Sequence, residues 1–223
     1  MPAGEISILL FTLGVAALAT VAILPLGVAL GLLLARRDFF GKTVVETLVA
    51  LPLVLPPVAT GFVLLRIFGR RSGLGSFLER LGLDVVFTWR GVVVAMAVMS
   101  LPLLVRAARV AFEGVNPRLE EAARSVGASE RRVFLRVTLP LAARGIVGGA
   151  LLAFARALGE FGATILVAGN LPGRTTTIST AIFQAVETGD EARALRFLAG
   201  AVILAFAAVA TSEALLRRSG GTH

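Results

Sequence analysis

The stretch EEAARSVGASERRVFLRVTLP, residues 120–140, concentrates charge in a chain that is otherwise strongly apolar. The 223 residues are 57% hydrophobic, and their mean hydropathy is +0.88. Long apolar runs bounded by arginine are the usual sign of helices that cross a bilayer. A charged, helix-prone segment between two of the most apolar regions therefore indicates a loop outside the membrane with a task of its own.

The apolar runs predict an all-α fold, a polytopic transmembrane helix bundle of about five spans that forms a single domain over residues 1–223. The first run, 6–35, carries no charge and is long enough to cross with tilt. The other expected spans are 47–65, 91–105 with a C-terminal extension, 137–158 and 197–212. Residues 161–171 are too short to cross, so we interpret them as the end of the fourth span or a partly inserted segment. A six-span alternative would make them cross.

The distribution of basic residues predicts how the chain sits in the membrane. The net charge is +8, but arginine is spread along the chain without a basic, aromatic-interleaved patch, so we expect no nucleic-acid partner. An external N-terminus places 13 of the 22 basic residues in the inner segments 36–42, 106–144 and 217–223. The cluster in residues 66–73 counts against this bias. We expect the N-terminus outside and the C-terminus in the cytoplasm.

Local signals predict a short helix in the charged loop. Asn116 is a suitable cap, Pro117 suits the first helical position, and Gly127 is a typical C-terminal stop, with a second helix start at Ser129. Four residues at helical spacing make a narrow apolar face: Leu119, Ala122, Ala123 and Val126. The helix could lie on the membrane surface or receive a partner. Its small residues favour a partner, since a lipid anchor more often offers Leu, Phe or Trp.

The same stretch resembles the EAA signature of ABC importer permeases. EAARSVG, nine residues and VTLP match it in spacing, and Val137 is a mild departure where isoleucine is commoner. The resemblance implies a cytoplasmic coupling helix over residues 117–128 that docks on a separate ATP-hydrolysing subunit. The implied coupling residues are Glu120, Glu121, Ala122, Ala123, Gly127 and Ala128.

The chain offers no chemistry of its own for energy supply. Its only lysine, in GKT at 41–43, lacks the glycine that a phosphate-binding loop needs at position 36, which is Arg36. There is no cysteine, and the single histidine is His223. We therefore expect no metal, no cofactor and no enzymatic activity in this chain, with ATP and Mg²⁺ bound by the partner ATPase. A membrane-embedded enzyme would need clustered catalytic groups, and a channel would not need a coupling helix.

Longer stretches resemble the molybdate branch of these permeases. They include DFFGKTVVETLVALPLVLPPVATGF and FARALGEFGATILVAGNLPGRTTTISTAIF, and the resemblance extends over nearly all of residues 6–216. It implies a homodimer in a bacterial or archaeal cytoplasmic membrane, surrounded by lipid, with two ATPase subunits and an extracytoplasmic oxyanion-binding protein. The cargo would be molybdate or tungstate. The alternative is a sulfate or thiosulfate permease, although that branch tends to be longer.

Candidate pathway or gate residues lie where helices are expected to weaken. Arg156 and Glu160 are four apart, so their side chains can meet on a helix, as a gate or as a structural pair. Prolines within 51–61 predict a kinked helix, which would line the pathway or only serve packing. The full set of candidates is Pro52, Pro56, Pro57, Arg156, Glu160, Gly162, Thr164 and Asn170. The hydroxyls and the one cation of residues 174–177 are either an external oxyanion contact or part of a solvated loop.

Overall fold

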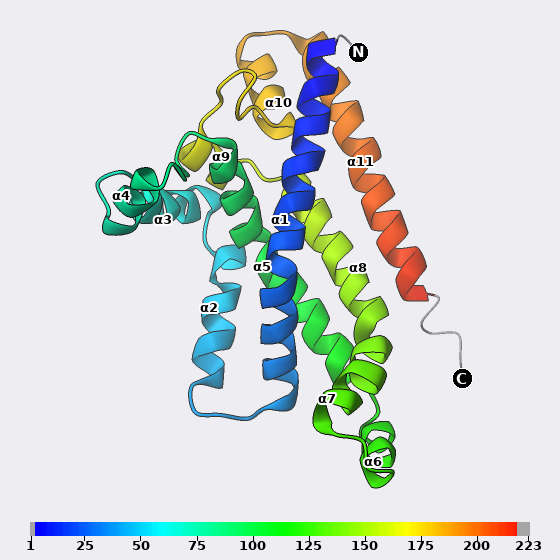
Figure 1. Cartoon of the computed structure of the whole chain (residues 1–223). Coiled ribbons are helices and arrows are strands. Elements are labelled where there is room, and N and C mark those ends of the chain that lie inside the picture. Colours follow the sequence, from blue (N-terminus) through cyan, green and yellow to red (C-terminus); the bar gives the residue numbers. More distant parts are fainter. Residues whose placement is uncertain (1–2, 218–223) are drawn as a thin grey trace.

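The computed structural model describes residues 3–217, which fold into helices joined by short segments (Figure 1). In chain order the elements are α1 (Ala3–Arg36), α2 (Lys42–Val54), α3 (Pro57–Phe68), α4 (Gly73–Arg80), α5 (Trp89–Glu113), α6 (Pro117–Ser125), α7 (Glu130–Val133), the π-helical η1 (Phe134–Thr138), α8 (Leu139–Leu158), α9 (Gly162–Ala168), α10 (Ile178–Glu187) and α11 (Glu191–Arg217). The expected cytoplasmic tail, 217–223, lies outside the described residues apart from its first position.

The number of spans agrees with the sequence prediction. Four helices are long and apolar enough to cross a membrane: α1, α5, the continuous helix Glu130–Leu158, and α11. The bent pair α2–α3 brings the number to five when it is counted as one span. At 1.5 Å per residue, α1 is about 51 Å long. It therefore extends well past a hydrocarbon core of about 30 Å.

The second span is broken, not kinked as the sequence predicted. The axes of α2 and α3 differ by 112°. Pro52 lies inside α2 without ending it, whereas the break falls at Leu55 and Pro56, both with extended ψ angles of 145° and 133°. A residue that precedes proline is pushed out of the helical region, and here two consecutive residues precede prolines. Two extended residues in succession turn the chain, where a single proline would only bend it.

The 161–171 region forms a separate short helix and is not the end of the fourth span. Helix α8 ends at Leu158, and α9 has only seven residues. That is about 10 Å of helix, far too short to cross a bilayer. The six-span reading and the reading as the end of the fourth span are therefore both wrong, and the segment is an independent insert between α8 and α10.

Small residues bring the three central helices close together. Helix α5 packs along α1 on one side and α8 on the other. A Cβ built on Gly31 would lie 2.6 Å from the Cβ of Ala108, and one on Gly145 would lie 2.7 Å from the Cβ of Ala111. Only glycine permits such an approach, as in small-xxx-small packing between membrane helices. Gly27 meets Leu104 in the same interface, so Gly27 and Gly31 both serve packing within one subunit.

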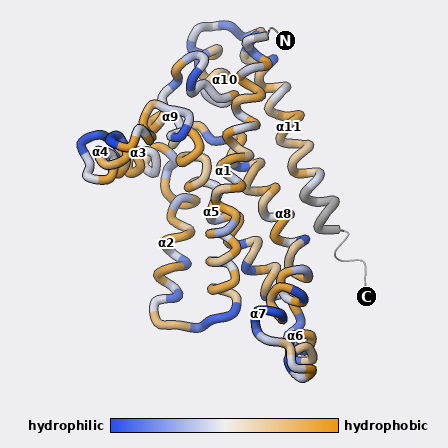
Figure 2. Tube along the Cα trace, viewed as in Figure 1, coloured by the Kyte–Doolittle hydropathy of each residue, from blue (hydrophilic) through white to orange (hydrophobic). Residues whose placement is uncertain are grey.

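The two ends of the bundle differ in content. The N-terminus and α10 lie at one end, while α6, α7 and the 37–41 loop lie at the other, and α3 and α4 project sideways (Figure 1). Hydrophobic residues follow the long helices, and hydrophilic residues gather at α6–α7, at the 37–41 loop and around α4 (Figure 2). Hydrophilic residues also occur in the connection between α10 and α11, so charge lies at both ends of the bundle and on the lateral projection.

Candidate functional site

Two helices, α6 and α7, start one after the other in the charged loop, as the sequence predicted. The side chain of Asn116 accepts a hydrogen bond from the Arg118 N–H at 3.0 Å, and Pro117 occupies the first turn of α6. Ser129 directly precedes α7, which starts at Glu130. Capping satisfies a backbone donor that would otherwise have no partner at the helix start.

The C-terminal end of α6 is a Schellman motif built on Gly127. The Ala128 N–H donates to the Ala123 carbonyl at 3.1 Å, and the Gly127 N–H donates to the Arg124 carbonyl at 2.9 Å. Gly127 has a φ of +83°, in the left-handed region where other residues are strained. The helix therefore ends at Ser125, and residues 126–128 of the expected coupling helix form its cap.

Helix α6 presents apolar side chains that no other part of the described chain covers. Val126 is 85% exposed and Leu119 is 48% exposed. Ala122 is exposed as well, and Ala123 is half-buried. We call Leu119, Ala122 and Val126 the docking face. This face lies on the segment that projects furthest at its end of the molecule (Figure 1).

Glu120, one of the coupling residues that the resemblance implied, does not lie on this exposed surface. Its side chain is buried, with 7% of the residue exposed. The carboxylate accepts hydrogen bonds from the Arg36 guanidinium at 2.8 Å and from the Thr138 hydroxyl at 2.7 Å. Arg36 is the last residue of α1, and Thr138 immediately precedes α8. Glu120 therefore anchors α6 to two transmembrane helices, while its neighbour Glu121 is exposed.

A widened helical turn lies next to this anchor. Residues Phe134–Thr138 form a π-helix between α7 and α8. Pro140 occupies the first turn of α8, where its missing N–H leaves the carbonyl four residues earlier without its usual donor. The wider π-turn accommodates that gap and directs Thr138 toward Glu120.

The two helix breaks that contain the candidates Pro56, Pro57, Glu160 and Gly162 meet in space. We call residues 55–57 and 159–162 the break junction. A Cβ built on Gly162 would lie 2.8 Å from the Cβ of Pro57. One turn further along, a Cβ on Gly61 would lie 2.8 Å from the Cα of Ala163. The starts of α3 and α9 are therefore in direct backbone-to-backbone contact, a packing that any larger residue would force apart.

An ion pair spans the second break. The Arg156 guanidinium lies 2.9 Å from the Glu160 carboxylate, which confirms the predicted contact. The predicted helical geometry is wrong, since α8 has ended at Leu158. The second Glu160 oxygen accepts the Ala163 N–H at 2.8 Å and so caps α9. Glu160 is 1% exposed, whereas the Arg156 side chain keeps 28% of its surface open.

Comparison with known families assigns the chain. The sequence from residue 27 to 216 matches the family described as the binding-protein-dependent transport system inner membrane component. The chain belongs to that family. Some relatives align with almost the whole length of this inner membrane component. The Molybdenum transport system permease protein ModB of Escherichia coli is 47% identical over 94% of this chain and 93% of its own.

Other relatives agree with this assignment, and a solved structure shares the fold. The Putative molybdenum transport system permease protein YvgM of Bacillus subtilis is 42% identical over 86% of this chain and 85% of its own. The Sulfate transport system permease protein CysT of Salmonella typhimurium is 36% identical over 81% of this chain and 66% of its own. The MetNI methionine ABC transporter in inward-facing conformations has a similar fold, with a TM-score of 0.69 at 19% identity over 96% of this chain and 95% of its own.

The remaining pathway candidates of this inner membrane component do not share one surface. Thr164 is completely buried on α9, and its hydroxyl has no hydrogen-bond partner among the described residues. Asn170 lies apart, donating to Gln184 at 3.0 Å and accepting from Thr176 at 2.7 Å. Pro52 is half-buried within α2. The break junction therefore brings together Pro57, Glu160 and Gly162, but leaves Asn170 as a structural contact of the following loop.

The threonines of 175–177 are structural and not a solvated loop or an open oxyanion contact. All three are buried. The Thr175 hydroxyl accepts the Leu171 N–H at 2.9 Å, and Thr177 caps α10 in a capping box. Arg174 alone remains exposed. Arg36 and Thr138, the partners of Glu120, were missed from the sequence because no local spacing links residues so far apart.

Proposed function

We propose that the chain is the transmembrane permease subunit of an ATP-driven importer that moves molybdate or tungstate into the cell. The observation that carries this proposal is the 47% identity over 94% of the chain to the E. coli molybdenum permease protein. In the proposed assembly, two copies of the chain form the pathway. An extracytoplasmic binding protein delivers the oxyanion, and two ATPase subunits bind ATP and Mg²⁺.

The proposed contact with the ATPase is the docking face of α6. It combines exposed apolar residues with the exposed carboxylate of Glu121, as expected for a surface that a partner covers. Glu120 supports this role from beneath, since it joins α6 to α1 and to the start of α8. Movement of α6 by the ATPase would therefore reach two transmembrane helices directly.

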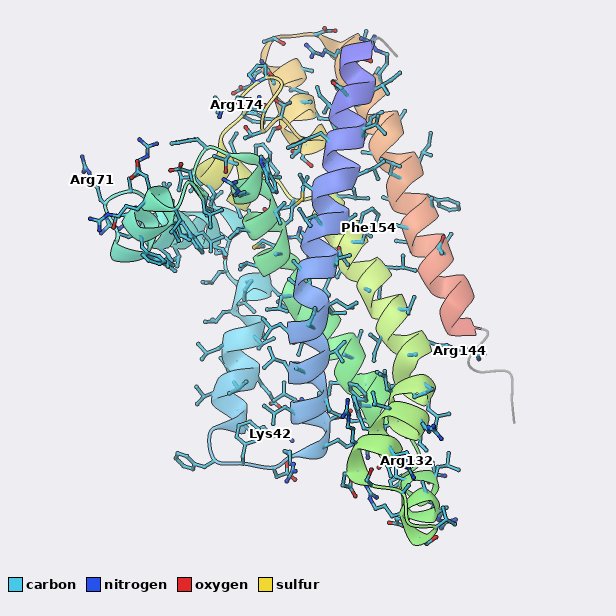
Figure 3. All side chains as sticks on the ribbon, viewed as in Figure 1. Lys42, Arg71, Arg132, Arg144, Phe154 and Arg174 are labelled. Atoms are coloured by element: carbon cyan, nitrogen blue, oxygen red, sulfur yellow. The ribbon has the colours of Figure 1, made fainter. Side chains whose placement is uncertain are left out.

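The proposed orientation places α6 in the cytoplasm and the N-terminus outside. The 37–41 loop lies at the same end as α6, and Lys42 and Arg132 mark that end in Figure 3. Basic residues near span ends favour the cytoplasmic side. This arrangement puts the docking face where ATP is available.

The proposed pathway passes the break junction. A dianion that crossed apolar lipid would meet a very large desolvation cost, so it needs a polar or hydrated route. Broken helices at membrane depth are found where the freed backbone groups are buried in protein or line a cavity. In this chain the breaks at 55–57 and 159–162 are adjacent, and an ion pair holds the second one. We propose that they separate when the importer opens.

A sulfate or thiosulfate permease is the second candidate. It is supported by the 36% identity to the Salmonella sulfate permease protein, which is lower than the identity to the molybdenum relatives. The two candidates share a fold and mechanism and differ only in the oxyanion.

The test is uptake of labelled molybdate into cells that lack their own importer. The cells would carry this permease with its neighbouring binding-protein and ATPase genes. We expect uptake that tungstate blocks and sulfate does not. Block by sulfate moves the assignment to the sulfate branch. Absence of uptake by a correctly assembled complex contradicts molybdate as the cargo.

A further inference from the structure

A basic hollow lies at the N-terminal end of α5, at the end opposite α6. It has a volume of about 840 Å³ and is formed by the end of α3, the start of α4, the segment before α5 and the loop after α9. Four arginines and one aspartate provide its charged lining: Arg66, Arg70, Arg71, Arg174 and Asp84. We call it the arginine hollow. Arg71 and Arg174 both line it and come from different segments of the chain (Figure 3).

Most of its positive charge is uncompensated. Arg70 pairs with Glu79 at 3.2 Å and with Asp84 at 3.7 Å. Arg66, Arg71 and Arg174 form no ion pair with any residue of the described chain, and all three are exposed. A concave surface lined by one sign of charge concentrates ions of the opposite sign.

Membrane topology does not account for this charge. The hollow includes residues 84–88, directly before α5, and α5 then runs 25 residues to the coupling end. That is about 37 Å of helix, enough to place the hollow on the outer side when α6 is cytoplasmic. The positive-inside rule disfavours arginine clusters there. A basic cluster that opposes the topological bias indicates a task on that side.

The hollow is connected to the break junction through shared elements. One wall is the end of α3, whose start contacts Gly162, and another wall is the loop that follows α9. The Phe87 N–H donates to the Val167 carbonyl of α9 at 2.9 Å. Phe87 has a φ of +57°, an unusual conformation for a bulky residue. The wall is therefore fixed to α9, so a ligand in the hollow lies next to the proposed pathway.

We propose that the arginine hollow is an outer receiving site for a tetrahedral oxyanion and holds the transported ion as it enters from outside. This proposal rests on the function proposed above. Guanidinium groups offer planar donor forks that match oxyanions. Their exposure keeps each contact weak, as a transient site requires. The phosphate of a lipid headgroup has the same chemistry, so the experiment must separate these two sources.

The first experiment measures protection of the arginines in the assembled transporter without its binding protein. Phenylglyoxal labels arginines, and mass spectrometry gives the labelling rate at each position. We expect molybdate to slow labelling of Arg66, Arg71 and Arg174 several-fold relative to chloride at equal ionic strength. Arg80, on α4 but outside the lining, is the matched control and should label at an unchanged rate.

The lipid source is distinguished by comparing a phosphate-free maltoside detergent with phosphatidylglycerol nanodiscs. Protection by molybdate in both environments supports the proposal. Protection that arises in nanodiscs without molybdate, and that molybdate does not increase, assigns the hollow to lipid and overturns it. Equal slowing at Arg80, or no protection in either environment, overturns it as well.

The second experiment measures uptake by a triple variant, R66Q/R71Q/R174Q, with R80Q as its control. We expect initial uptake at low ionic strength to fall roughly tenfold in the triple variant, with a smaller difference at high salt. Normal uptake by the triple variant, together with unprotected arginines, overturns the receiving site while leaving molybdate transport by the wild type intact. If the wild type moves no molybdate, the cargo is wrong, and protection by sulfate would then identify the ion.

Discussion

Two buried glutamates of this chain hold helix ends in different ways. Glu160 pairs with Arg156, four residues away, and caps the next helix through the Ala163 N–H. Glu120 pairs with Arg36, 84 residues away, and with the hydroxyl of Thr138. The first joins neighbouring segments at a break, whereas the second joins α6 to two spans. The difference teaches that a similar carboxylate–guanidinium contact can fix local geometry or join elements that are distant in the chain.

The largest effect is expected at Glu160. The E160A substitution leaves Arg156 without its partner and the Ala163 N–H without its acceptor. We expect a loss of about 3 kcal/mol of stability, since breaking a largely buried pair is costly. We also expect lower molybdate uptake. Thermal unfolding of the detergent-solubilised assembly and cellular uptake are the measurements.

The E160Q variant separates the two contacts of Glu160, because the amide oxygen can still accept the Ala163 N–H. Intermediate stability is expected. If E160A transports normally despite reduced stability, the pair is structural and the proposed gate at the break junction is wrong.

Substitutions of Glu120 and Glu121 distinguish a buried residue that anchors α6 from an exposed residue on its surface. E120Q weakens charge-assisted hydrogen bonds worth roughly 1.5–3 kcal/mol each. We expect the ATPase to assemble normally with E120Q but less molybdate to enter per ATP hydrolysed. E121Q, on the exposed side, should instead weaken assembly without changing thermal stability. The ratio of uptake to ATP hydrolysis in proteoliposomes tests this, and identical behaviour of the two variants would contradict the anchor.

Gly127 offers a test of the docking surface with a control matched for backbone strain. Both Gly127 and Gly41 have positive φ, +83° and +88°, and a Cβ on either would meet nothing within 4 Å. G127V and G41V should therefore each cost about 1–2 kcal/mol from backbone strain. We expect only G127V to uncouple transport while the protein stays in the membrane. Equal uptake by both variants would falsify the coupling role of this turn.

The smallest effect is expected for an ion pair that is local and exposed to solvent, in contrast to the buried pairs of Glu120 and Glu160. Lys42 lies 2.8 Å from Asp38 in the loop after α1, and the hydrogen bond from Lys42 lowers the pKa of that carboxyl. A lowered pKa means that the stabilisation is present above the carboxyl's unfolded pKa and is lost as pH falls through its folded pKa. We expect K42Q to raise the pKa of Asp38 toward its ordinary value, as an NMR titration would measure. An unchanged pKa would mean that the pair contributes nothing.

Local sequence signals predicted a large part of the segment that contains α6 and α7. The cap at Asn116, the turn at Gly127 and the restart at Ser129 depend on residues within a few positions of one another, and all three are found in the structure. The contact between Arg156 and Glu160 is also local and was predicted, although the end of α8 at Leu158 was not. Such features depend on short-range backbone geometry, which the chain specifies almost directly.

The sequence by itself determined the all-α class, the number of spans, the exposed apolar face of the coupling segment and its capped ends. These follow from apolar run lengths and from short-range hydrogen bonding. Only the tertiary structure decided that Glu120 is buried against Arg36, that the breaks at Pro57 and Gly162 touch, and that Arg66, Arg71 and Arg174 share one hollow. Those contacts join residues that are distant in the chain, and they depend on how closely glycine and alanine allow the helices to approach.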